Sequence, residues 1–256
     1  MKAWNQSALL AAIACASAPA MAQSTDFVEP TRGFVLERGM TAPAKSVSAD
    51  LEAGLEEGQF GGGIRVGLPS SELILRGGRT NTAIPEANTS NEALFKYSIP
   101  GLEDTDRTQF DWSVYGGFGH TSVDYDQYDE HRTNMRLGTA LTMTIDTLIL
   151  NFAPEVVYGR YSVDGEVNGI DVDNEDDDTY VNFGVGAYFN LPETDYGRFQ
   201  PGIEAGFSTE DDQDAIVNLG VRWMVKDRVT LDVVMINIGD ADTFSFPGVA
   251  RLNVSF

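Results

Sequence analysis

The chain has 256 residues, a length that suits one large all-β domain. Its formal net charge of −22 excludes functions that need a basic surface, nucleic-acid binding first among them, because nucleic-acid phosphates attract Lys and Arg. A single cysteine, Cys15, excludes an intramolecular disulfide, so the fold must be held by hydrogen bonding and packing.

The first 22 residues resemble a secretory signal peptide. Lys2 supplies a positive start, residues 8–19 are apolar and small, and the stretch "AMA" that ends at Ala22 has the form of a cleavage site. We expect cleavage after Ala22, which leaves a mature chain without cysteine. A second interpretation stays open, because "AIAC" loosely resembles the lipid-attachment box of bacterial lipoproteins.

Residues 23–44 show no sustained hydrophobic period and contain several Pro and Gly residues. We interpret them as a periplasmic N-terminal segment, although the stretch "RGFVLERG" could instead tuck into the domain that follows. That domain is expected to span residues 45–256.

From residue 45 onward, apolar and polar residues alternate, which is the pattern of a half-buried strand. The clearest case is 110–118, where Phe110, Trp112, Val114 and Phe118 share one face. No segment of the mature chain approaches the about 18–20 apolar residues of a membrane helix. The alternation predicts twelve strands, at residues 47–55, 60–68, 73–75, 93–99, 110–118, 135–145, 148–158, 181–191, 199–207, 215–223, 229–235 and 250–256.

The connections alternate in length. Short turns such as "PSS", "DT", "PETDYG" and "KD" follow even-numbered strands, whereas odd-numbered strands end in long, mostly acidic stretches such as "DYDQYDEHRT" and "DGEVNGIDVDNEDDD". Outer-membrane barrels have short periplasmic turns and long extracellular loops, whereas a soluble sandwich has no reason for such alternation. We therefore predict an all-β fold, a transmembrane antiparallel up-and-down β-barrel of about twelve strands.

The chain ends with "ARLNVSF", in which Leu252, Val254 and Phe256 share one face. This ending resembles the C-terminal assembly signal of bacterial outer-membrane proteins, which implies recognition by the barrel-assembly machinery. The last strand must also pair with the first, because an open sheet edge in hydrocarbon leaves unpaired backbone groups. At the level of the class, residues 45–256 resemble bacterial outer-membrane β-barrels, both porin-like barrels and solitary autotransporter β-domains. The resemblance implies an outer-membrane location, in contact with lipid and lipopolysaccharide.

The faces opposite the apolar ones carry the charges and should line the lumen. Two functions remain open for such a lumen: a narrow passive pore that selects small solutes by charge and size, or a closed structural envelope barrel in which the charges pair with one another. Barrels of about eight strands are filled by side chains and those of roughly 16–18 are open, so twelve lies between. The predicted lining residues are Arg65, Arg76, Asp111, Arg136, Glu155, Glu204, Arg222, Asp232 and Arg251.

An enzymatic alternative rests on "GHTS", in which His120 and Ser122 have the spacing H-x-S and share the predicted lipid-facing parity. The pair resembles the His-x-Ser of outer-membrane phospholipase A and of lipid A deacylases, which implies a lipid-facing acyl hydrolase with an imidazole-activated serine. Those families continue with Asn, where this chain has Val123. Apart from this alternative, we predict that the protein is not an enzyme.

The acidic run at 171–178 is the remaining candidate for chemistry. Clustered carboxylates can hold divalent cations. The run lacks the glycine and the closing glutamate of an EF-hand loop, and we interpret it as a solvated loop. The sequence shows no cofactor motif and no zinc spacing, so neither a cofactor nor a structural metal is predicted.

Overall fold

The computed structural model describes ten stretches of the chain, and the predicted signal peptide, with Cys15 and Ala22, lies outside them. The described residues are 31–54, 60–80, 87–100, 104–105, 107–125, 127–167, 170–210, 215–226, 228–238 and 248–256.

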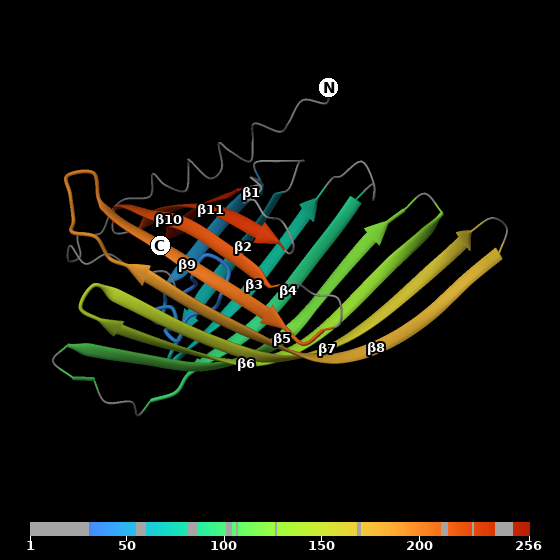
Figure 1. Ribbon diagram of the computed structural model, residues 1–256, viewed down its shortest axis with the longest axis horizontal. Helices are drawn as coiled ribbons and strands as arrows, with labels where there is room; N and C mark the ends of the chain where they lie inside the picture. The colour runs from blue at the N-terminus through green and yellow to red at the C-terminus, as the bar shows by residue number, and fades with distance from the viewer. Residues whose placement is uncertain are drawn as a thin grey trace, which may run out of the picture.

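Twelve strands form one closed sheet in which each strand is antiparallel to its neighbours in sequence, and β12 returns to pair with β1 (Figure 1). This confirms the predicted fold class. No helix among the described residues is long and apolar enough to cross a membrane. The strands are β1 (Val47–Gly54), β2 (Phe60–Leu68), β3 (Ser71–Thr80), β4 (Ala87–Ser98), β5 (Thr108–Asp124), β6 (Tyr128–Ile145), β7 (Leu148–Val167), β8 (Ile170–Phe189), β9 (Arg198–Ser208), β10 (Ile216–Lys226), β11 (Val229–Ile238) and β12 (Val249–Ser255).

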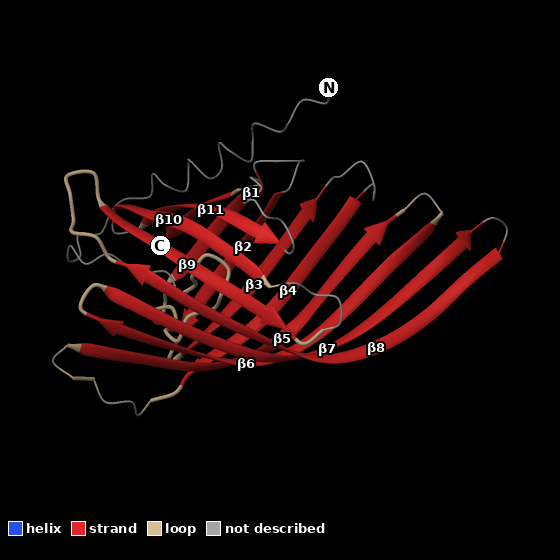
Figure 2. Ribbon diagram, viewed as in Figure 1, coloured by secondary structure: helices blue, strands red, loops and turns tan. Residues whose placement is uncertain are grey.

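Strands β5 to β8 are longer than predicted and extend well beyond the rest of the barrel (Figure 2). The acidic run at 171–178 was predicted to be a loop, and this prediction was wrong. It belongs to β8, which pairs with β7 from Leu148↔Phe189 to Val167↔Ile170. The hydrophobic period fades there because both faces of the extended hairpin meet water, while the backbone ladder continues without it.

The two faces of the sheet differ as the alternation predicts. Apolar side chains point outward, with Leu137 on β6 68% exposed and Phe118 on β5 60% exposed. The inner face buries charged side chains, among them Lys96, Glu204 and Arg222. This arrangement is the inverse of a soluble β-protein and is typical of a barrel that stands in lipid.

The chain terminus closes the barrel. Glu52↔Arg251 and Leu51↔Leu252 are partners in the β1–β12 ladder. The backbone N–H of Phe256 donates to the carbonyl oxygen of Val47 at 2.7 Å. The alternating terminal segment is therefore tied down by the first strand, and neither edge of the sheet is left open.

Residues 31–42 lie inside the barrel, where the N–H of Gly39 donates to Thr142 and that of Ala42 donates to Glu72. Residues 31–38 form a tight hairpin, in which Arg38 N–H donates to the carbonyl of Thr31 at 3.1 Å and Gly33 N–H to that of Leu36 at 2.8 Å. Phe34 near its tip is fully buried. We call residues 31–38 the lumen hairpin. The stretch "RGFVLERG" at residues 32–39 therefore lies against the inner wall, one of the two positions that the sequence left open, and residues 23–30 lie outside the described residues.

Candidate functional site

A buried carboxylate on β9 holds the tip of the lumen hairpin. Glu204 accepts hydrogen bonds from the backbone N–H groups of Phe34 at 2.6 Å, Val35 at 2.8 Å and Leu36 at 3.3 Å. The hydroxyl of Tyr188 donates to the same carboxylate. Buried N–H groups need partners, and one charged acceptor here supplies three of them.

Two arginines from the same side of the barrel bind the carbonyl groups of the tip. Arg222 on β10 donates to the carbonyl of Gly33 at 3.0 Å, and Arg251 on β12 donates to that of Phe34 at 2.7 Å. Both guanidinium groups also pair with Asp232 on β11, at 2.7 Å from Arg222 and 3.5 Å from Arg251. The carboxylate offsets the charge that the two arginines bring into the lumen.

Glycines of the wall make room for the hairpin. A Cβ atom on Gly220 of β10 would stand 2.9 Å from the ring of Phe34, and one on Gly184 of β8 would stand 2.4 Å from a methyl group of Leu36. The space that these glycines leave is therefore occupied by the hairpin. Phe34 also packs edge-on against the ring of Tyr188, with 5.5 Å between ring centroids.

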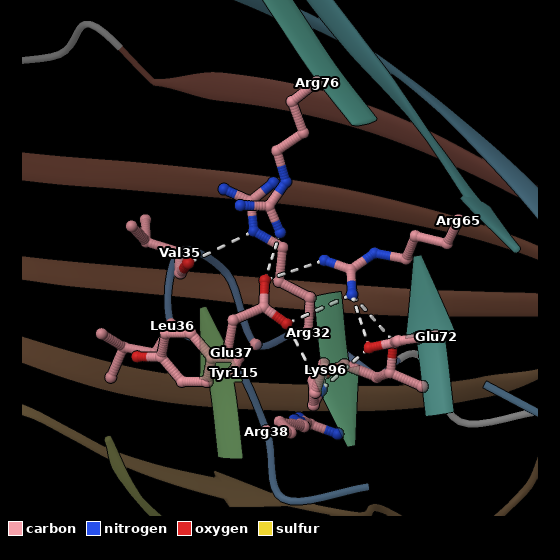
Figure 3. A network of polar contacts seen from close by, with 12 residues as sticks. Arg32, Val35, Leu36, Glu37, Arg38, Arg65, Glu72, Arg76, Lys96 and Tyr115 are labelled. Carbon is pink, nitrogen blue, oxygen red and sulfur yellow. Dashed lines mark hydrogen bonds and ion pairs between the residues drawn. The ribbon is translucent and has the colours of Figure 1, made fainter. Parts of the chain in front are cut away.

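The opposite wall holds the hairpin through a buried ion cluster (Figure 3). Glu37 pairs with Arg65 on β2 at 3.0 Å, with Lys96 on β4 at 3.3 Å, and with Arg76 on β3. A second carboxylate, Glu72 on β3, pairs with Arg65 at 3.2 Å and Lys96 at 3.0 Å. Burying such charges is costly unless each is paired, so the hairpin and these three strands depend on one another.

Another network lies further along the lumen, toward the extended ends of the long strands. Arg136 on β6 pairs with Glu155 on β7 at 2.6 Å and also with Glu92 on β4. Glu155 accepts further hydrogen bonds from Tyr115 at 3.1 Å and Asn182 at 2.9 Å. These charges are partly buried, and each ion pair joins an arginine to a glutamate.

The predicted lumen residues are all placed on the inner side or at its margin. Eight of them make the ion pairs or hydrogen bonds described above: Arg65, Arg76, Arg136, Glu155, Glu204, Arg222, Asp232 and Arg251. Asp111 is half-buried and accepts a hydrogen bond from Gln109 at 3.3 Å. Glu72, which the prediction omitted, shares the parity of Arg76 and could have been found from the alternation. Glu37 lies outside any periodic segment, so its position had no such signal.

The structure does not join His120 to Ser122. His120 Nδ1 lies 3.2 Å from the hydroxyl of Thr133, and the Ser122 hydroxyl donates to Asp124 at 3.2 Å. Among the described residues no hydrogen bond connects the imidazole with the serine. The ring of His120 instead stacks on that of His131, with 5.9 Å between centroids. A serine activated by histidine needs the two groups within hydrogen-bond reach, and here each has another partner.

The acidic hairpin shows no assembled metal site. Over the described ranges, no group of three or more His, Cys, Asp or Glu side chains is placed to hold a metal ion. Its contacts are those of a solvated surface, for example the ion pair of Arg160 with Glu175 and the hydrogen bond from Tyr158 to Asp177 at 3.0 Å.

The hairpin leaves space in the lumen at both ends. A cavity of about 530 Å³ opens at the end of the barrel beside Lys45, which precedes β1, and Phe256, which follows β12. We call it the turn-end vestibule. A second cavity of about 420 Å³ lies toward the other end, beside Asn91 and Asn134, and we call it the loop-end cavity. Arg32 and Asp50 line both cavities.

The comparisons with known proteins returned structural similarities alone. The sequence matches no described protein family and no curated protein. Among solved structures, the translocator domain of autotransporter NalP from Neisseria meningitidis aligns at 13% identity, over 82% of this chain and 86% of that one, with a TM-score of 0.48. The N-terminal β-barrel domain of Pseudomonas aeruginosa OprF aligns at 11% identity, over 84% of this chain and 100% of that one, with a TM-score of 0.29. Salmonella typhi OmpF in complex with daunomycin aligns at 9% identity, over 82% of this chain and 96% of that one, with a TM-score of 0.32.

Because these likenesses are distant, the assignment of the fold rests on the chain itself. Its strands follow one another around a closed antiparallel sheet, with apolar side chains outside and paired charges inside. A closed up-and-down barrel with this pattern is the architecture of the outer-membrane β-barrel class that the sequence resembles.

Proposed function

We propose that the protein is a non-enzymatic outer-membrane barrel that gives small solutes a narrow, passive route, with the lumen hairpin as its constriction. The observation that carries the proposal is that Arg32 and Asp50 line both the turn-end vestibule and the loop-end cavity. Two cavities that share wall residues lie next to one another. A rearrangement of Arg32, whose side chain is half-buried, would join them.

The same features support an orientation. The acid-rich ends of β7 and β8 would stand in water outside the cell, where divalent cations could bridge them to lipopolysaccharide phosphates. The turn-end vestibule would open to the periplasm. The outward residues Leu252, Val254 and Phe256 would be offered to the barrel-assembly machinery during insertion.

A closed structural barrel is the second candidate, and the clamping of the hairpin favours it. One wall binds its tip through Glu204, Arg222 and Arg251, and the other binds Glu37 through three cations. If the side chains between the two cavities never part, the protein is an envelope component without transport.

Single-channel recording of the refolded mature chain in a planar bilayer separates the two candidates. A narrow route should give small, discrete current steps. A chain that is folded by its gel mobility but gives no current would contradict the pore and favour the closed barrel.

A disulfide that fixes the lumen hairpin to β8 tests whether conduction depends on movement of the hairpin. The Cγ of Leu36 lies 3.2 Å from where a Cβ atom on Gly184 would stand, a spacing that a disulfide between Leu36→Cys and Gly184→Cys can bridge. Small steps should persist after oxidation, because the proposed route passes beside the hairpin. Steps that vanish on oxidation and return on reduction would assign conduction to movement of the hairpin. Leu36→Cys alone, treated with the same oxidant, is the control.

A further inference from the structure

The turn-end vestibule is basic, although the chain as a whole carries a net charge of −22. Among the described residues that line it, the acidic side chains are Asp50 and Asp232, and Phe256 also lines it. Against these stand six cationic side chains: Arg32, Lys45, Arg65, Arg222, Arg228 and Arg251. The cavity therefore concentrates positive charge in a protein that otherwise repels anions.

Three of these cations are already neutralised by carboxylates. Arg65 pairs with Glu37 and Glu72, Arg222 with Asp232, and Arg251 with Glu52 at 2.7 Å. Their role is to hold the lumen hairpin in place, as described above.

The other three, Arg32, Lys45 and Arg228, make no ion pair within the part of the chain that the structure describes. The Nε of Arg32 donates to the carbonyl of Val35 at 3.2 Å. Arg76 and Arg251 add positive charge close to Arg32, against Glu37 and Glu52. Lys45 and Arg228 are exposed at the mouth of the cavity. A guanidinium deep in the vestibule and two cations at its entrance thus remain available to an anion.

A buried hydroxyl lines the same cavity without a partner. Thr230 on β11 is 4% exposed, and its Oγ1 makes no hydrogen bond to any described residue. Leaving a buried hydroxyl unpaired costs about 1–3 kcal/mol, so such a group marks a place where a ligand or water completes the site.

We infer that the turn-end vestibule is a binding site for a small anion that carries phosphate or carboxylate groups. Guanidinium groups match both kinds of oxyanion in shape and charge. A cavity of about 530 Å³ falls within the range typical of small-molecule sites. The inference goes beyond the proposed function, because binding at the vestibule does not require that the lumen conduct.

Calorimetric titration of the refolded chain tests the site, with pyrophosphate and citrate as probes, in an uncharged detergent without lipid and at low salt. We expect saturable binding of one anion per chain. Arg32→Gln should weaken it about tenfold or more, since a hydrogen bond to a charged group is worth about 1.5–3 kcal/mol. Arg32→Lys should restore part of the affinity, and Thr230→Val, which keeps the shape, should weaken it severalfold.

Arg160→Gln is the matched control, because it removes one positive charge from a residue of β7 that does not line the vestibule, and it should leave binding unchanged. Arg228→Gln, at the exposed mouth, tests the site with a variant that places little burden on folding, and it should weaken binding severalfold. Absence of saturable binding, or an equal loss in Arg160→Gln, would overturn the inference. Binding that needs added anionic lipid and ignores Arg32→Gln would identify lipid phosphates at Lys45 and Arg228 as the true ligands, and would also overturn it.

The outcome is separable from that of the pore. A barrel that is silent in the bilayer but binds pyrophosphate through Arg32 refutes conduction and leaves the site standing. A conducting barrel whose titration is flat does the reverse.

Discussion

Glu204 and Phe34, which stand 170 positions apart in the sequence, are joined by a hydrogen bond of 2.6 Å from the backbone N–H of Phe34 to the carboxylate. The same carboxylate also binds the N–H groups of Val35 and Leu36. One inward side chain of β9 thereby fixes the position of the lumen hairpin, and with it the shape of the two cavities.

Glu204→Ala should reduce the free energy of unfolding by several kcal/mol. The substitution leaves up to three buried N–H groups without an acceptor, and each unpaired group costs about 1–3 kcal/mol. It should also enlarge single-channel steps, because the tip is no longer held. Urea unfolding in lipid vesicles measures the first effect. Glu193→Gln, which lies in an exposed turn and also removes one negative charge, is the control and should change neither quantity.

Gly220→Ala should destabilise the barrel through the hairpin and not through β10 alone. The new Cβ would stand 2.9 Å from the ring of Phe34, and overpacking of this kind costs about 1–3 kcal/mol. In a double-mutant cycle with Phe34→Ala, the double variant should lose less stability than the sum of the two single losses, by about 0.5–3 kcal/mol. Gly206→Ala on β9, where a Cβ would meet no atom within 4 Å, should be nearly neutral. Strictly additive costs would mean that Phe34 does not occupy this space in solution.

The barrel could be predicted from the sequence because lipid enforces a two-residue period. Phe110, Trp112 and Phe118 stand on one face of β5, and each strand could be found by the same rule. The lumen hairpin could not be predicted in this way. Its residues are surrounded by the wall on all sides, so burial imposes no alternation on them, and Glu37 reads in sequence as a surface charge.

The prediction of a loop at 171–178 was wrong for the opposite reason. Both faces of the hairpin formed by the ends of β7 and β8 meet water, so residues 173–178 show no alternation of apolar and polar side chains. The backbone nevertheless pairs without a break from Gly159↔Asp178 to Val167↔Ile170. The candidate site residues that lie on strands could be predicted, because alternate positions of a strand point inward. The contacts that join them to residues 31–38 depend on tertiary structure alone.

Ser122→Ala should have no effect on lipid turnover. The Ser122 hydroxyl donates to Asp124, and His120 lies against Thr133, so no general base is in place to activate the serine. Release of fatty acid from phospholipid vesicles by the refolded chain measures this. Hydrolysis above the protein-free background that disappears in Ser122→Ala would restore the enzymatic alternative, and His120→Gln would then have to abolish it too.

Leu137→Arg should cost up to about 2–4 kcal/mol of stability in a bilayer, because it places a charge on the lipid face, where the cost rises toward the bilayer midplane. Leu137 is 68% exposed on β6 and pairs with Val156 of β7 on the same outward face. Asn134→Arg, three residues away, puts the same group into the loop-end cavity, where water can solvate it, and should be far milder. Urea unfolding of both variants in vesicles decides the matter. Equal costs would mean that the outer face does not meet hydrocarbon, and would remove the membrane assignment together with the proposed route through the lumen.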